Sequence, residues 1–202
     1  MSSIKISKVI HIFSDNLSLD IDLPEGWVGK LHIKTEIEAT LKNIDDQDGT
    51  DYMSKFVLCK EEQKEEFYKY VILYYYGGIF ARYEDGKELN DKFCDIQKLT
   101  LYLEKRQISF FQCPSLISVG YIHHPQLITM ILDTPFVSFS KLYKKINDNI
   151  SHKTLITSLP LQSYLEKIKG DLNTDKTIIY SVGSFITGVL SGFLYKYLTD
   201  KT

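Results

Sequence analysis

Residues 60–85, KEEQKEEFYKYVILYYYGGIFARYED, decide the fold, because they predict a helix that ends on two glycines and leads directly into a strand. Residues with the spacing of one helical face are Phe67, Tyr70, Val71 and Tyr74. Gly77 and Gly78 allow the left-handed conformation that ends many helices, followed by a sharp turn. Residues 79–81 then form a short apolar run that is typical of a buried strand.

Charged residues follow this predicted strand directly at its carboxyl end. They are Arg82, Glu84 and Asp85. In open α/β sheets, ligands usually bind outside the carboxyl ends of the strands. We therefore expect the functional site at this edge of the sheet.

The run YKYVILYYYGGIFARYED resembles the sugar-binding region of glycosyltransferase family 32, which is related to yeast mannosyltransferases and capsular polysaccharide transferases. The positions that match are Tyr70, Ile72, Leu73, Tyr74, Tyr76, Gly77, Gly78 and Ile79, and Phe80 stands where the family has Tyr. The polar positions differ. Glu66 replaces an Asp and Lys69 replaces an Arg. The family's Asp-x-Asp motif is degenerate, because Arg82-Tyr83-Glu84 stands in its place.

The resemblance implies a GT-A-like (Rossmann-like) α/β domain with a mixed sheet flanked by helices, which binds a nucleotide sugar and a divalent cation, Mn²⁺ or Mg²⁺. Such cations need oxygen ligands. Arg82 cannot bind a cation, so Glu84 and Asp85 are the predicted metal ligands. Arg82 could instead pair with the diphosphate through its planar guanidinium. These three residues are the candidate catalytic residues.

The same resemblance places Glu66 and Lys69 near the base or ribose of the donor. It also places Gly77 and Gly78 in the donor-binding region. His11, in a predicted first strand over residues 8–13, would lie near the nucleotide at the end of that strand. The alternative for His11 is burial in the core, and we favour that interpretation.

Length and composition indicate one folded globular domain. The chain has 202 residues, of which 44% are hydrophobic and 25% are charged. The formal net charge of -2 argues against nucleic-acid binding, which depends mainly on neutralising phosphates. Cys59, Cys94 and Cys113 have no disulfide or zinc-site spacing, which fits reduced thiols in a cytosol-like compartment.

The rest of the chain alternates between strand and helix patterns, which supports a sheet with helices on its faces. Further strands are expected near residues 31–33, 107–112 and 117–122, and helices over 36–41, 95–105, 126–132 and 138–150. The acidic run at residues 45–49 predicts a solvated turn. Trp27 is expected to be a packing anchor. Pro125 is a helix-start signal, and the adjacent His123 and His124 are not expected to be functional.

Residues 177–195 contain no charge and are bracketed by Lys176 and Lys196. This length just spans a bilayer, and Ser184, Gly188 and Gly192 repeat at the spacing of membrane-helix packing faces. We therefore expect a globular domain over 1–175 and a membrane anchor over 176–198. The protein would be tail-anchored with its domain in the cytosol. A buried segment of a cytoplasmic protein is the alternative.

Three functions remain open on the sequence alone. The first is a sugar transferase that moves a sugar from a nucleotide-sugar donor to a glycan or lipid acceptor, with altered metal dependence. The second is a catalytically inactive domain of the same fold that serves as a membrane-anchored binding or scaffold protein. The third is that the aromatic run is only a core helix and strand, as such runs often are.

Overall fold

The computed structural model describes residues 4–14, 23–81, 86–137, 154–157 and 159–169. The chain divides into two compact units, residues 1–161 and 162–202. In the second unit the structure describes only the part of a helix that spans residues 162–169. The fold described below is that of the first unit.

The first unit is an α/β structure with a mixed six-stranded sheet in the order β2-β1-β3-β5-β4-β6. The strands are β1 (Val9–Ser14), β2 (Val28–Ile33), β3 (Gly78–Ala81), β4 (Phe110–Cys113), β5 (Leu116–Val119) and β6 (Thr154–Ile156). Only β5 is antiparallel to its neighbours, so the other strands of this sheet all run in one direction. The prediction of a mixed sheet flanked by helices is confirmed.

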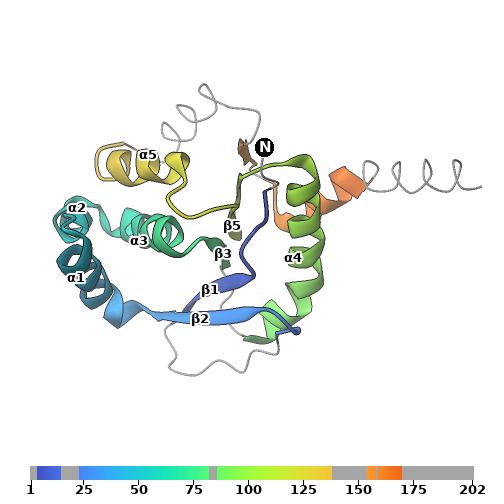
Figure 1. Cartoon of the computed structure of the whole chain (residues 1–202), viewed down its shortest axis with the longest axis horizontal. Coiled ribbons are helices and arrows are strands. Elements are labelled where there is room, and N and C mark those ends of the chain that lie inside the picture. Colours follow the sequence, from blue (N-terminus) through green and yellow to red (C-terminus); the bar gives the residue numbers. More distant parts are fainter. Residues whose placement is uncertain (1–3, 15–22, 82–85, 138–153, 158, 170–202) are drawn as a thin grey trace, which may run out of the picture. The chain divides into compact units, whose positions relative to one another are not determined.

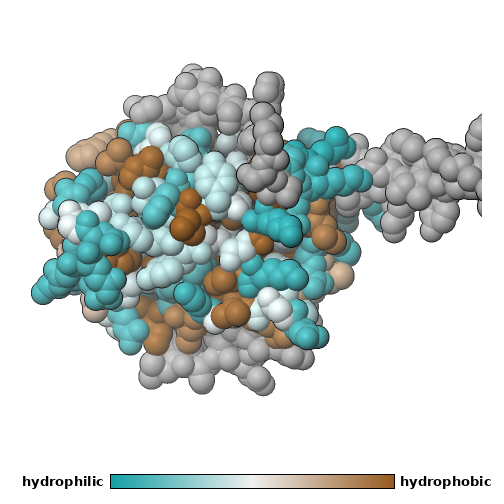
Figure 2. All heavy atoms as spheres, viewed as in Figure 1, coloured by the Kyte–Doolittle hydropathy of each residue, from teal (hydrophilic) through white to brown (hydrophobic). Residues whose placement is uncertain are grey.

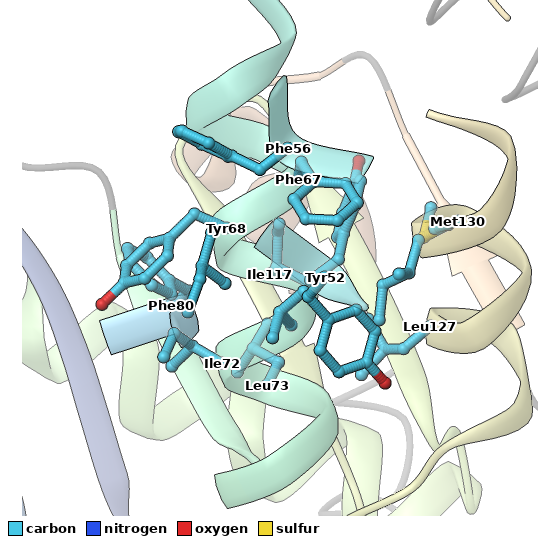
Figure 3. Close-up of a cluster of buried hydrophobic side chains, with 14 of the residues drawn as sticks. Tyr52, Phe56, Phe67, Tyr68, Ile72, Leu73, Phe80, Ile117, Leu127 and Met130 are labelled. Atoms are coloured by element: carbon cyan, nitrogen blue, oxygen red, sulfur yellow. The ribbon is translucent and has the colours of Figure 1, made fainter. Parts of the chain in front are cut away.

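The helices cover both faces of the sheet (Figure 1). They are η1 (Lys34–Glu36), α1 (Ile37–Asp48), α2 (Tyr52–Leu58), α3 (Glu61–Tyr76), α4 (Gly86–Arg106) and α5 (Pro125–Asp133). Helices α3 and α5 pack side by side on one face, with α2 against α3 and α1 against α2, and α4 lies on the other face. Figure 3 shows the apolar core between α3, α5 and the sheet, with Phe67, Ile72 and Phe80 fully buried in it.

Helix α3 begins and ends where the sequence predicts. The side chain of Gln63 accepts a hydrogen bond from the backbone N–H of Lys60, the residue that precedes the helix, at 3.1 Å. Gly77 ends the helix with a φ of 63°, and its N–H donates to the Leu73 carbonyl at 2.9 Å. The chain then enters β3 directly, with only Gly77 between the helix and the strand.

Gly78 allows β3 to approach β1 closely. Its φ is 89°, a conformation that other residues rarely adopt. A Cβ atom at this position would lie 2.5 Å from the backbone oxygen of Val9. The second glycine is therefore required by strand packing.

The structure corrects two predictions made for other parts of the chain. The acidic run at residues 45–48 is the last part of helix α1 and not a turn, and Gly49 ends that helix with a φ of 65°. Both carboxylate oxygens of Asp45 accept hydrogen bonds from the first amides of α2, Tyr52 N–H and Met53 N–H, each at 2.7 Å. The run is therefore structural, because unpaired amides at a helix start need acceptors. The helix predicted at residues 95–105 starts earlier, at Gly86.

Other predictions are confirmed. Strand β1 is internal, between β2 and β3. Trp27 packs against Phe93 with an edge-to-face ring contact at 5.0 Å. Pro125 is the first residue of α5. The helix predicted over 138–150 and the anchor predicted over 176–198 lie outside the described residues.

Replacing Gly78 by Ala should destabilise the protein by about 2–5 kcal/mol, from the positive φ and the clash with Val9. Gly49→Ala is the matched control, since Gly49 also has a positive φ but has no atom within 4 Å of an added Cβ. Urea unfolding of both variants measures the difference. Equal losses of unfolding free energy would show that the close approach of β3 to β1 has no energetic role.

Candidate functional site

The order of the strands creates a switch point between β1 and β3. From β1 the chain moves to β2 on one side, and later returns to β3 on the other side of β1. The strand order therefore reverses between β1 and β3, and α/β proteins usually bind ligands at the carboxyl ends of the strands at such a point. Residues 15–22 follow β1, and residues 82–85 follow β3.

The candidate catalytic residues Arg82, Glu84 and Asp85 lie outside the described residues. The structure does show the position of Ala81, the residue directly before them. Ala81, the last residue of β3, pairs with Ile12 of β1, two residues before β1 ends. Residues 82–85 therefore follow directly on the part of β3 that pairs with β1.

Lys69 lies over the same pair of strands. Its side chain is fully buried, and its Nζ atom lies 5.7 Å from the ring centre of Phe13 in β1 and 5.4 Å from that of Phe80 in β3. The ammonium forms an ion pair with Glu65 and lies 3.6 Å from a carboxylate oxygen of Glu66. Burial lowers the pKa of Lys69, while the hydrogen bond to Glu65 opposes this effect.

Glu66 is held from the other side by a tyrosine. The Tyr70 hydroxyl donates to Glu66 Oε2 at 3.3 Å and accepts from the Gln112 amide of β4, also at 3.3 Å. A chain of polar groups therefore runs through the core from β4 to Glu65, whose side chain is 44% exposed.

His11 lies in the core, in the middle of β1, and not at the end of that strand. Its Nε2 atom is 3.0 Å from the carbonyl oxygen of Gly77, and its Nδ1 atom is 2.9 Å from His32 Nε2. The remaining ring nitrogen of His32 is 2.8 Å from the Tyr68 hydroxyl. These contacts join β1, β2 and helix α3.

The direction of each hydrogen bond in this chain follows from its one obligate acceptor. A carbonyl can only accept, so His11 Nε2 carries a hydrogen. Burial, followed by the neighbouring His32, lowers the pKa of His11 to about 3, and burial followed by Lys30 lowers that of His32 to about 4. Both rings are therefore neutral at pH 7, so His32 donates to His11 and Tyr68 donates to His32. The Tyr68 hydroxyl also has a side-chain hydrogen bond with Thr40 of α1, and the chain of hydrogen bonds fixes the two rings in one arrangement.

Gly77 and Gly78 lie at the amino end of β3, whereas residues 82–85 follow its carboxyl end. The strand has four residues, and each adds roughly 3.3 Å to its length. The structure therefore does not bring these glycines together with the chain that leaves β3. They contact β1, His11 and the backbone of Tyr121 and Ile122.

A buried Ser–His pair, Ser109 and His124, was not predicted from the sequence. Ser109 Oγ lies 2.9 Å from His124 Nε2, which resembles a nucleophile beside a base. The other ring nitrogen, Nδ1, accepts the Gln126 N–H at 3.1 Å, and burial lowers the pKa of His124 to about 4. Nε2 therefore carries the hydrogen and donates to Ser109. His124 therefore caps helix α5 and cannot accept a proton from Ser109 to activate it.

In the described part of the chain, no three His, Cys, Asp or Glu side chains are grouped so that they could hold a metal ion. None of its helices is long and apolar enough to cross a membrane, and residues 177–195 lie outside it. Comparison with protein-family models, curated proteins and solved structures finds no match to this chain.

The buried histidines should make the protein lose stability in mild acid. Their folded pKa values lie below the usual 6.5, so the unfolded chain binds protons first as the pH falls. The stabilisation is complete above about pH 6.5 and is lost on the way down toward pH 4. His11 and His124 should each contribute up to about 1.4 kcal/mol per pH unit in that range. Urea unfolding between pH 7.5 and 5 measures this slope.

His124→Asn is the informative variant, because Asn can still cap α5 but does not titrate. It should reduce the slope, whereas His123→Gln, at an exposed position, should leave it unchanged. An unchanged slope in His124→Asn would contradict the assignment of a neutral, buried His124.

Lys69→Met should cost about 3–5 kcal/mol of unfolding free energy, because it leaves Glu66 buried without its cation. Lys64→Met is the control, since that lysine pairs with the exposed Glu61 on the same helix and should have little effect. Combining Lys69→Met with Glu66→Gln should recover part of the loss. If the double variant is less stable than Lys69→Met, the pairing of Lys69 with Glu66 is not what stabilises this region.

Proposed function

We propose that this protein is a glycosyltransferase-like α/β domain that binds a nucleotide sugar at the carboxyl ends of β1 and β3. The observation that carries the proposal is the switch point between β1 and β3, because residues 82–85 follow β3 directly in the sequence. The resemblance of the segment around Gly77 and Gly78 to the sugar-binding region of glycosyltransferase family 32 supports the same site. A GT-A-like arrangement of the whole domain is part of this proposal.

The polar residues divide the proposed site into two parts. Lys69 is already paired with Glu65 and Glu66, so this cluster would suit hydroxyl groups of the ribose or sugar better than phosphate. The diphosphate would then lie on the side of residues 82–85. There, Arg82 has the planar set of donors that pairs with phosphate oxygens.

A divalent cation fits the chemistry of Glu84 and Asp85, whose carboxylate oxygens are the ligands that Mg²⁺ and Mn²⁺ prefer. The nearby carboxylates Glu65 and Glu66 are already engaged by Lys69. The cation would therefore be held by Glu84 and Asp85, with phosphate oxygens or water as its other ligands. When bound, it would supply positive charge that stabilises the departing nucleotide diphosphate. Arg82 would add charge of the same sign.

A second candidate function is a catalytically inactive domain of the same fold that acts as a binding or scaffold protein. The observation that favours it is the internal compensation of Lys69 by Glu65 and Glu66, which stabilises the fold without any ligand. The replacement of the family's Asp-x-Asp by Arg82-Tyr83-Glu84 also favours an inactive domain. In both candidates, residues 177–195 would anchor the domain to a membrane, and the acceptor of the active form would be a glycan or a lipid.

Calorimetric titration of the full chain with UDP and GDP, each with and without Mn²⁺, tests the proposal. A working transferase site should bind one of the nucleotides in the presence of the metal, and Glu84→Ala should abolish this binding. A site in which Arg82 replaces the metal should bind without Mn²⁺ and lose affinity in Arg82→Ala.

Matched controls are Glu38→Ala in α1 and Arg106→Ala at the end of α4, both at exposed positions. Neither should change the affinity for nucleotide. If neither nucleotide binds the unmodified protein under any of these conditions, the transferase proposal is wrong and the inactive domain remains.

A further inference from the structure

A row of polar side chains inside the fold has no part in the proposed nucleotide site. On the face of the molecule shown in Figure 2, the apolar residues among the described ones form small groups separated by hydrophilic ones. The described residues therefore offer no broad apolar docking surface on that face. The interior, in contrast, holds a row of hydrogen bonds that links β1, β2, α3 and α1 through His11, His32, Tyr68 and Thr40.

At neutral pH every hydrogen in this row points the same way. His11 Nε2 donates to the Gly77 carbonyl at 3.0 Å, and His32 Nε2 donates to His11 Nδ1 at 2.9 Å. The Tyr68 hydroxyl donates to His32 Nδ1 at 2.8 Å. Because a hydroxyl has one hydrogen, the bond between Tyr68 and Thr40 is donated by Thr40. The row therefore begins at a hydroxyl that can also accept, and it ends at a carbonyl that can only accept.

One proton can enter this row without the loss of a hydrogen bond. If His32 Nδ1 gains the proton, it donates to the Tyr68 oxygen, and the Tyr68 hydroxyl turns to donate to Thr40. The same pairs of atoms that hold the row at neutral pH stay hydrogen-bonded after the change. A hydroxyl hydrogen rotates about its C–O bond, so the reversal needs no movement of a heavy atom.

A second proton cannot be accommodated in this way. The Nδ1 atom of His11 faces the N–H of His32 at 2.9 Å, so hydrogens on both nitrogens would force the rings apart. His11 is fully buried, whereas His32 is partly exposed. A charge is less costly where water can reach it. The first proton therefore belongs on His32, and a second proton would break the contact between the two rings.

The groups around the row keep both rings neutral at pH 7. Lys30, on the same strand as His32, opposes a positive charge on either ring. From α3, Tyr76 lies 6.2 Å from the ring on β1, and from β3 the apolar Phe80 faces both rings. Glu36, directly before α1, acts on the tyrosine of the row. Lys69 also lies over this face of the sheet, but carboxylates of its own helix pair with it.

We propose that this row is a pH-sensitive switch in which His32 takes up one proton in acid and the Tyr68 hydroxyl turns from His32 to Thr40, while the fold stays intact. The switch joins the edge of the sheet to α3 and α1, and it does not depend on nucleotide binding. A further proton, on His11, separates the two rings. The fold therefore opens at this edge only after the switch has turned.

Nitrogen NMR of the full chain with ¹⁵N-labelled histidine rings, between pH 7.5 and 4, tests the switch. As the pH falls, His32 Nδ1 should gain a hydrogen while His11 stays neutral. Thr40→Val removes the acceptor of the turned hydroxyl at nearly the same shape, so it should lower the His32 midpoint by about 0.7 pH unit, the value of one neutral hydrogen bond. Tyr68→Phe should lower that midpoint at least as much. Tyr76→Phe keeps the ring beside His11 and should leave the midpoint unchanged.

The proposal is overturned if His11 takes up the first proton, or if Thr40→Val and Tyr68→Phe both leave the His32 midpoint unchanged. Amide hydrogen exchange of the same samples shows whether the fold is intact during the titration. If the backbone amides of the core lose their protection before His32 gains a proton, the switch does not exist and the row has only a structural role.

Discussion

The close approach of β3 to β1 at Gly78 is the contact on which the rest of the structure depends. A Cβ atom at position 78 would lie only 2.5 Å from the Val9 oxygen, and only glycine readily takes the positive φ that starts the strand there. This contact sets β3 beside β1, which places helix α3 over both strands and ends β3 at the carboxyl edge. The position of the proposed site therefore follows from a packing constraint at the other end of the strand.

Helix α3 is joined to the sheet by two polar chains as well as by apolar contacts. One runs from Tyr68 through His32 and His11 to the Gly77 carbonyl, and the other from Gln112 through Tyr70 to Glu66 and Lys69. Buried polar groups are costly unless they are paired, so such chains favour one arrangement of helix and sheet over alternatives that apolar packing alone would tolerate. The first chain joins β1, β2 and α3 and serves the fold. The second reaches the half-exposed Glu65 beside the switch point, so it connects the core to the proposed site.

The fold was largely predictable because its signals are local. The glycine pair, the helical spacing before it and the apolar run after it correctly predicted α3, β3 and their junction. Strand β5, predicted near residues 117–122, and the helix start at Pro125 were predicted for the same reason. The acidic run was misread because its function is to cap the following helix α2 through Asp45, a contact between residues seven and eight positions apart. Periodicity within one segment carries no information about such a contact.

The candidate site was less predictable than the fold. Sequence alone could not show that Gln112 and Tyr70 hold Glu66, because β4 and α3 are far apart in the chain and meet only through the sheet. Burial also separated His11 from the strand end, where the family resemblance had placed it. That the functional site lies at the carboxyl edge of β3 stays a prediction, because residues 82–85 lie outside the described part of the chain.

Hydrogen exchange of the full chain with and without UDP or GDP, in the presence of Mn²⁺, would locate a bound nucleotide. A nucleotide at the switch point between β1 and β3 should slow exchange in the last residues of β1, in residues 81–86 and in α3 around Lys69. Exchange in the loop at residues 120–124 should not change. Protection confined to that loop, or no protection at either edge, would contradict a nucleotide site at the switch point between β1 and β3.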